Sequence, residues 1–271
     1  MEISVTTADG TRLTARRTGH GVPVVLVHGS AGGLDSWDPV TSLMGDAFEL
    51  WVYARRGYAP SDGCRRPKTY ADDVADLRAV LAAAGGPAHV VGGSYGGTVA
   101  LHAASAGGVP IRSVALFEPP LFASGAAAAA ALDGFRSLLE AGDVAAAARL
   151  FAADVARVPE QIIAALTEAG AGPPDPAQDA AAAAEAVGCL HDLEAMAADT
   201  DEVRRWSALD VPVLLMQGGQ TWAPMPATMD ALADALPGAA RTVLPGQSHF
   251  APHTAPEMFA EALCRFLREQ Q

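Results

Sequence analysis

The sequence is poor in cysteine and has no long apolar run. Its three cysteines, Cys64, Cys189 and Cys264, are scattered and form no CxxC or Cys/His cluster, which argues against a disulfide framework and against a metal site. No stretch reaches the roughly 18 to 20 apolar residues of a membrane span. The residues from Met1 to Arg17 hold no apolar signal-peptide segment. We therefore expect a cytoplasmic protein in a reducing setting.

Basic residues are scarce as well. The chain has 18 Lys and Arg, of which only Lys68 is a lysine, against 31 Asp and Glu, and its net charge is −13. A protein that binds duplex nucleic acid needs a basic surface to replace the counterions of the phosphates. Binding to an anionic membrane needs the same sign of charge. The composition argues against both partners, and the excess of acid is read as a contribution to solubility.

The sequence does contain enough apolar residues for a large core. Half of its 271 residues are hydrophobic, which fits one large domain or one domain with an insertion. Apolar runs predict buried strands, and apolar residues at helical spacing predict helices between them. Strands are expected at 22–27, 48–53, 89–91, 114–117, 211–216 and 241–244, after a hairpin at 3–15, and helices at 37–44, 70–84, 98–106, 227–236 and 256–268. This alternation predicts an α/β fold with a mostly parallel sheet.

The stretch from 121 to 206 breaks the alternation. It is rich in alanine, contains no convincing strand, and is interrupted at Gly142, at Pro159 and at Gly172–Pro176. An ordinary crossover between strands is far shorter. We therefore expect an all-helical lid at 121–206, inserted into a core formed by residues 1–120 and 207–271.

One short motif points to nucleophilic chemistry. Gly92-Gly93-Ser94-Tyr95-Gly96 matches G-x-S-x-G and stands between a predicted strand and a predicted helix. Such a turn strains its apex residue and exposes the apical side chain, and the small neighbours remove clashes. Ser94 is therefore predicted to be a nucleophile. The alternative is a glycine-rich turn that serves close packing or binds a phosphate, although a dinucleotide site would place its glycines after the first strand.

Further motifs make the chain resemble the α/β-hydrolase superfamily along nearly its whole length. They are the hairpin, His28-Gly29, Arg55-Arg56-Gly57-Tyr58, the Ser94 turn, a helical cap, and a late histidine in Gly246-Gln247-Ser248-His249-Phe250. The resemblance implies an eight-stranded, mostly parallel sheet flanked by helices, with the second strand antiparallel. It also implies a catalytic triad in the order Ser, acid, His.

The resemblance assigns the base to His249, after the last predicted strand. An imidazole suits this role because its pKa lies near working pH. His253, four residues later, is the rival candidate.

The acid departs from the usual pattern. The family places an Asp after the seventh strand, but residues 216–225 contain no carboxylate, and Thr221 or a neighbour fills that place. Glu118, at the end of the sixth strand, is the predicted acid because some family members use that position. The alternatives are that Glu118 caps the first lid helix or pairs with an arginine, or that Ser94 and His249 act without an acid.

The resemblance also implies an oxyanion hole. Its two donors would be the backbone N–H groups of Tyr95 and Ser30, with Ala31 as the alternative to Ser30. His28 is expected to be a structural hydrogen-bonding group, and the turn at 55–58 an architectural ion pair.

Together these features predict a cofactor-independent serine hydrolase without a metal. Its substrate would be a carboxylic ester, lactone or thioester of a fairly apolar small molecule, so the expected enzyme is esterase-like. The oligomeric expectation is a monomer or homodimer. The alternatives are a non-hydrolytic enzyme of this fold (lyase, cyclase or acyl transfer) and a non-catalytic protein that binds a small ligand. The residues expected to contact the substrate are Trp37, Phe122, Trp206, Trp222, Met225 and Phe250.

Overall fold

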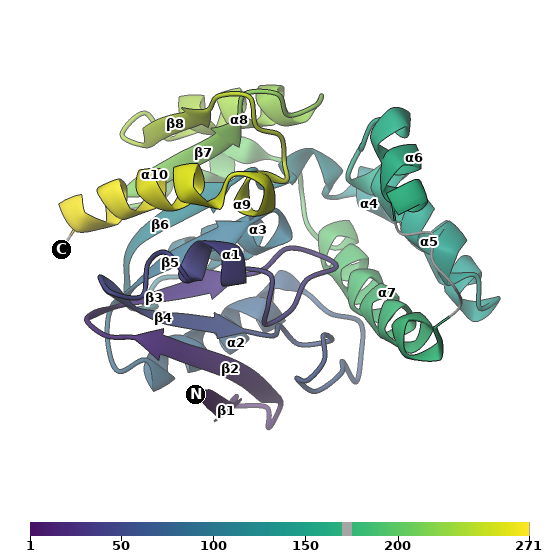
Figure 1. Ribbon diagram of the computed structural model, residues 1–271, viewed down its shortest axis with the longest axis horizontal. Helices are drawn as coiled ribbons and strands as arrows, with labels where there is room; N and C mark the ends of the chain where they lie inside the picture. Colours follow the sequence, from purple (N-terminus) through teal and green to yellow (C-terminus); the bar gives the residue numbers. More distant parts are fainter. Residues whose placement is uncertain (170–174, 271) are drawn as a thin grey trace.

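A computed structural model describes residues 1–169 and 175–270, which form one twisted sheet with helices on both faces (Figure 1). The strand order is β1-β2-β4-β3-β5-β6-β7-β8. β2 runs antiparallel to β1 and β4, and the remaining neighbours are parallel. The strands are β1 (Glu2–Thr6), β2 (Arg12–Gly19), β3 (Val22–Val27), β4 (Phe48–Tyr53), β5 (Ala88–Gly93), β6 (Ile111–Phe117), β7 (Val213–Gly218) and β8 (Ala240–Leu244).

The central strands are apolar along their length because both of their faces are covered. In β3, Val25 and Val27 pack into one core cluster and Val24 and Leu26 into the other. The first cluster includes the apolar side of α2 (Tyr70–Ala83), α3 (Tyr95–Ser105) and α8 (Met225–Ala235). The second includes residues of α1 (Asp38–Thr41) and α10 (Pro256–Glu269). Because successive side chains of a strand point to opposite faces of the sheet, one apolar run contributes to both core clusters.

A helical segment leaves the sheet after β6 and returns at β7. Between Phe117 and Val213 the residues that the structure describes contain helices and no strand. The segment lies to one side of the sheet, at the right of Figure 1. Its helices are α4 (Ala126–Glu140), α5 (Val144–Leu150), α6 (Glu160–Ala169) and α7 (Pro176–Ala197), with a π-helical turn at Phe151–Val155 and 3₁₀ turns at Leu121–Ala123 and Val203–Ala208.

The structure confirms the predicted fold class and most of the predicted elements. The helix expected at 37–44 is shorter, since α1 covers only Asp38–Thr41, and the one expected at 98–106 begins earlier, at Tyr95. Residues 172–174 of the break predicted at Gly172–Pro176 lie outside the described residues. The division into a core and a lid at the stated boundaries remains a prediction.

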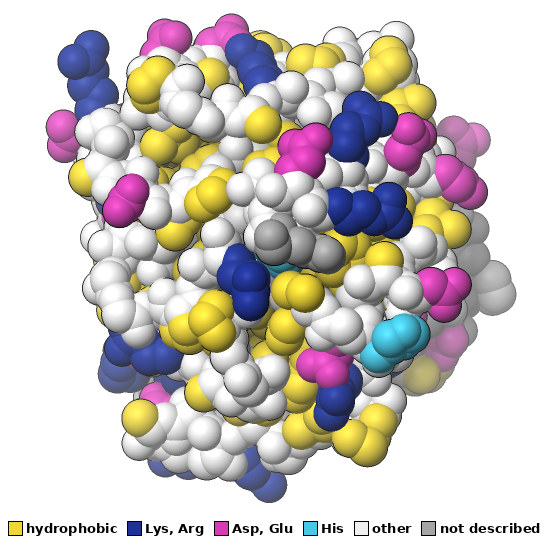
Figure 2. Space-filling view, turned by 90° about the vertical axis from the view of Figure 1, so that its left-hand side faces the viewer, with side chains coloured by type: hydrophobic (Ala, Val, Ile, Leu, Met, Phe, Trp, Pro, Cys, Tyr) yellow, Lys and Arg dark blue, Asp and Glu magenta, His cyan; other side chains and the backbone are white. Residues whose placement is uncertain are grey.

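The surface away from the helical segment carries dispersed charge. Figure 2 shows Lys and Arg side chains and Asp and Glu side chains scattered over this face, with hydrophobic groups between them. Across residues 1–169 and 175–270, no helix combines the length and the apolar character that a membrane crossing requires.

Candidate active site

Ser94 stands at a sharp turn between β5 and α3. Its backbone has φ 52° and ψ −125°, a conformation that is strained for a residue with a side chain. The glycines beside it permit the turn: a Cβ on Gly96 would lie 2.2 Å from the carbonyl oxygen of Val27, and one on Gly92 would lie 2.3 Å from that of Gly96. The sequence therefore uses glycine here for close approach, and the turn presents Ser94 at the carboxyl end of the sheet.

His249 and Glu118 meet at the same edge of the sheet. His249 follows β8, and its Nδ1 lies 2.5 Å from Oε2 of Glu118, which follows β6. The imidazole ring stacks on Phe117 with ring centroids 5.7 Å apart, and Trp222 meets it edge-on at 5.8 Å. These contacts fix the ring plane and leave Nδ1 facing the carboxylate.

The Glu118 carboxylate is fully buried and is held by the loop after β7. Its Oε1 accepts a hydrogen bond from the backbone N–H of Gly218 at 2.8 Å, and its Oε2 accepts one from the Thr221 hydroxyl at 3.1 Å. Thus the loop that contains no carboxylate receives the Glu118 side chain instead. In the described part of the chain, the partners of this carboxylate are these two groups and His249, with no arginine among them.

A second loop passes close to Ser94. A Cβ on Gly29 would lie 3.1 Å from Ser94 Cβ and 3.7 Å from Ser94 Oγ, so a side chain there would press on the nucleophile. The loop continues through Ser30 to Ala31, whose φ is 55°. This loop and Tyr95, the first helical residue of α3, therefore both adjoin Ser94.

Backbone strain is concentrated around these residues. Of the four non-glycine residues with positive φ in the described ranges, three are Ala31, Ser94 and Glu118. Each such conformation costs about 1 to 3 kcal/mol and persists only where the surroundings impose it. The surrounding fold therefore holds these three residues in place at a cost in stability.

Two cavities adjoin both Ser94 and His249. One, about 30 Å³ in volume, lies beneath the helical segment and is lined mainly by apolar side chains. These residues are Pro120, Phe151, Val155, Ala156, Met196, Trp222 and Met225, together with Ser30. The other cavity, about 290 Å³, includes the loop from His28 to Gly32 and reaches the exposed His253.

The predicted substrate-contact residues divide between these cavities and the core. Trp222 and Met225 line the small cavity, and Trp37 and Phe250 line the large one. Phe122 and Trp206 line neither. Phe122 packs against the main core, and Trp206 is 2% exposed with its ring edge-on to His102 at 5.0 Å.

His28 has the structural role expected of it. Its Nε2 accepts the backbone N–H of Arg55 at 2.9 Å, so its proton is on Nδ1, which donates to the carbonyl of Gly29 at 2.7 Å. Burial lowers the pKa of His28 to about 3, and the nearby Arg55 charge acts in the same direction. His28 is therefore neutral at working pH and shapes the loop rather than transferring protons.

Several site residues gave no signal in the sequence. Phe151 and Val155, in a π-helical turn, and Ala156, directly after it, line the small cavity. The Ala156 carbonyl accepts the Trp222 indole N–H at 3.0 Å. Alanine-rich helical sequence does not reveal which of its few large residues face a pocket. Within the described residues, no group of three or more His, Cys, Asp or Glu side chains could hold a metal ion.

Comparisons with known proteins agree with this fold. A sequence model described as the alpha/beta hydrolase family matches residues 24–262. No curated protein matches the chain. An alpha/beta hydrolase from Sphaerobacter thermophilus DSM 20745 is 30% identical, with a TM-score of 0.83 over 98% of this chain and 100% of that one.

Two further solved structures share the fold at lower identity. An enol-lactonase from Burkholderia xenovorans LB400 is 21% identical, with a TM-score of 0.79 over 98% of this chain and 100% of that one. A thermophilic esterase from Thermogutta terrifontis, with malate bound, is 23% identical, with a TM-score of 0.77 over 100% of this chain and 99% of that one.

Proposed function

The chain belongs to the alpha/beta hydrolase family, and from this premise we propose that it is a cofactor-independent serine hydrolase acting through Ser94, His249 and Glu118. The observation that carries the proposal is the 2.5 Å contact between His249 Nδ1 and Glu118 Oε2, beside a serine held at positive φ. A carboxylate at that distance holds the imidazole with its proton on Nδ1, so that Nε2 is free to accept one.

In the proposed reaction Ser94 Oγ attacks the carbonyl carbon of an ester while His249 Nε2 takes its proton. The negative charge on the carbonyl oxygen is stabilised by the backbone N–H groups of Ser30 and Tyr95. His249 then donates the proton to the leaving alcohol, which leaves an acyl group on Ser94. A water molecule, deprotonated by His249, hydrolyses this acyl-enzyme and regenerates the serine.

The two cavities suggest how an ester would lie. After the first step the alcohol must leave and water must enter, so the alcohol belongs in the large cavity that reaches exposed His253. The acyl group stays on Ser94 and belongs in the apolar cavity of about 30 Å³ beneath the helical segment. Because this cavity is small, we propose that the enzyme prefers short acyl chains.

Labelling with a fluorophosphonate tests the proposed chemistry. We expect stoichiometric labelling of the folded protein that disappears in Ser94→Ala, together with hydrolysis of p-nitrophenyl acetate. A folded sample that is neither labelled nor active on a panel of esters and lactones would exclude a serine hydrolase and favour a ligand-binding role.

A chain-length series tests the acyl assignment. We expect kcat/KM to fall at least tenfold from p-nitrophenyl acetate to the octanoate, and Phe151→Ala to move the preference toward longer chains because it enlarges the small cavity. Phe122→Ala is the matched control, since it removes the same ring from outside both cavities. Equal chain-length profiles for the two variants would contradict the assignment.

A further inference from the structure

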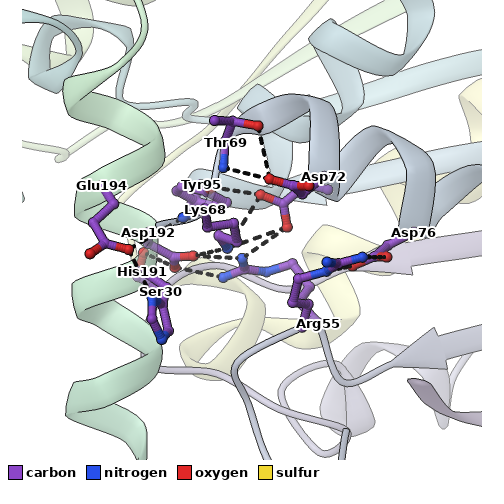
Figure 3. A network of polar contacts seen from close by, with 12 residues as sticks. Ser30, Arg55, Lys68, Thr69, Asp72, Asp76, Tyr95, His191, Asp192 and Glu194 are labelled. Carbon is purple, nitrogen blue, oxygen red and sulfur yellow. Dashed lines mark hydrogen bonds and ion pairs between the residues drawn. The ribbon is translucent and has the colours of Figure 1, made fainter. Parts of the chain in front are cut away.

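A cluster of four buried charges joins the helical segment to the core. Arg55 follows β4, Lys68 precedes α2, Asp73 lies in α2 and Asp192 lies in α7, and their side chains are at most 1% exposed. Figure 3 shows Asp192 pointing from its helix toward Arg55 and Lys68. The cluster contains two positive and two negative groups, so it is neutral as a whole.

Asp192 is the centre of these contacts. Arg55 donates to both of its oxygens, from Nη1 at 2.8 Å and from Nη2 at 2.7 Å, and Lys68 Nζ donates at 2.6 Å. Burial opposes ionisation, but the charges of Arg55 and Lys68 outweigh it and hold the pKa of Asp192 well below its usual range. Asp192 is therefore a fixed negative charge at working pH.

One arm of the cluster reaches the loop beside Ser94. The Ser30 hydroxyl donates to Asp192 Oδ2 at 2.7 Å, and so does the Tyr58 hydroxyl at 2.7 Å. The Tyr58 oxygen in turn accepts the backbone N–H of Ala31 at 3.3 Å. Arg55 also donates to the carbonyl of Gly29 at 3.0 Å, so both sides of Ser30 are held.

The other arm reaches the residue that follows the nucleophile. The guanidinium of Arg55 lies 4.3 Å from the centre of the Tyr95 ring, and Lys68 Nζ lies 4.8 Å from it. The Tyr95 hydroxyl donates to Asp73 at 2.7 Å. The same four charges thus fix the side chains of both Ser30 and Tyr95, whose backbone N–H groups are the proposed oxyanion donors.

From this juxtaposition we propose that Asp192 is a positioning residue that holds the oxyanion loop at Ser30 in place. This inference rests on the proposed function. A stability role alone explains the cluster poorly, because burying several charges carries a desolvation cost that apolar side chains of the same volume avoid. Fixed donors, in contrast, are what a transition state requires, since a displacement near 1 Å costs about a hundredfold in rate.

Asp192→Asn tests the inference against Asp76→Asn as a matched control. Asp76 is also 1% exposed and also forms a bidentate pair with an arginine, Arg56, at 2.9 Å and 2.6 Å. In the part of the chain described by the structure, Asp76 has no hydrogen bond to the 28–31 loop or to Tyr95. Both variants should lower the melting temperature, so stability alone cannot separate them.

The kinetic readouts separate them. For Asp192→Asn we expect kcat on p-nitrophenyl acetate to fall about 10- to 100-fold, with KM changed less than about threefold. Its fluorophosphonate labelling rate should fall by a similar factor, because the phosphonyl oxygen occupies the same position as the oxyanion. Asp76→Asn should keep kcat within about twofold.

Ser30→Ala supplies a second variant in case Asp192→Asn does not fold. It keeps the backbone N–H and removes only the hydroxyl bond to Asp192, so we expect a smaller loss of kcat, about 3- to 10-fold, with KM changed less than about threefold. Normal kcat in Ser30→Ala and Asp192→Asn, or an equal loss of kcat in Asp192→Asn and Asp76→Asn, would overturn the inference. Failure of the wild-type protein to label at Ser94 would overturn the proposed function itself, so the two failures are distinguishable.

Discussion

Replacing Glu118 with Gln probes the proposed acid through a single exchanged atom. Oε1 of Glu118 accepts the backbone N–H of Gly218 at 2.8 Å, so the amide oxygen of Gln must remain there. The amide nitrogen then takes the place of Oε2, 2.5 Å from His249 Nδ1. Because that nitrogen is a donor, Nδ1 must accept, and the imidazole proton moves to Nε2. The nitrogen that should receive the Ser94 proton is then already protonated.

The size of the expected effect follows from this reversal. The same exchange of a buried triad carboxylate for an amide in serine proteases lowers kcat by about 10⁴. That factor corresponds to about 5.4 kcal/mol in the activation barrier. KM should change less than about threefold, because Glu118 is fully buried and lines neither cavity beside Ser94.

The assay is hydrolysis of p-nitrophenyl acetate by Glu118→Gln, with Thr221→Val as the control. Thr221 gives the carboxylate one hydrogen bond, at 3.1 Å, so its loss should lower kcat less than about tenfold. Circular dichroism would confirm that both variants are folded. The assignment of Glu118 as the acid would be refuted if Glu118→Gln retained more than a tenth of the wild-type kcat. It would also be refuted if kcat fell further in Thr221→Val than in Glu118→Gln.

Two further predictions concern the fold that supports the site. Gly96→Ala should yield little folded, active protein, because the new Cβ would lie 2.2 Å from the Val27 carbonyl oxygen; wild-type kcat in a soluble variant would contradict the packing argument. Burial also lowers the pKa of His89 to about 4 in the folded protein. Below about pH 6.5 the imidazole is therefore protonated in the unfolded chain and still neutral in the folded one, so stability should fall as the pH drops from about 6.5 toward 4. We expect His89→Leu to reduce this loss by roughly 2 kcal/mol between pH 7 and pH 4.5 in urea unfolding, with the remaining slope due in part to His28, and an unchanged slope would show that His89 does not contribute.

Much of the fold could be read from the sequence because local pattern and tertiary environment agree. The run at 22–27 is apolar on both faces, and both faces of β3 are buried in the structure. Because glycines are poor helix formers, the sequence predicts a start for α3 at residue 98, after the glycines. Gly96 is nevertheless part of α3. It packs so closely against β3 that no side chain fits, and this packing requirement outweighs the low helix propensity of glycine.

The candidate site was predictable only where a motif marks it. Ser94, His249 and Glu118 each follow a strand, so their common edge follows from topology. Asp192 could not be found in this way, since it lies 137 residues from Arg55 in a helix with no distinguishing pattern. Aromatic residues are common both in substrate pockets and in packed cores, so the sequence alone cannot decide between the two for Trp206. In the structure it is buried with its ring edge-on to His102.

The sole lysine of the chain gives a built-in probe of conformational opening. The Lys68 side chain is 0% exposed in its contacts with Asp73 and Asp192, so an amine-acylating reagent cannot reach it in the closed molecule. Modification of Lys68 requires an opening that exposes its amine and breaks its contacts with Asp73 and Asp192. Its rate, followed by mass spectrometry, would therefore report how often the contacts between Lys68, Asp73 and Asp192 open under native conditions.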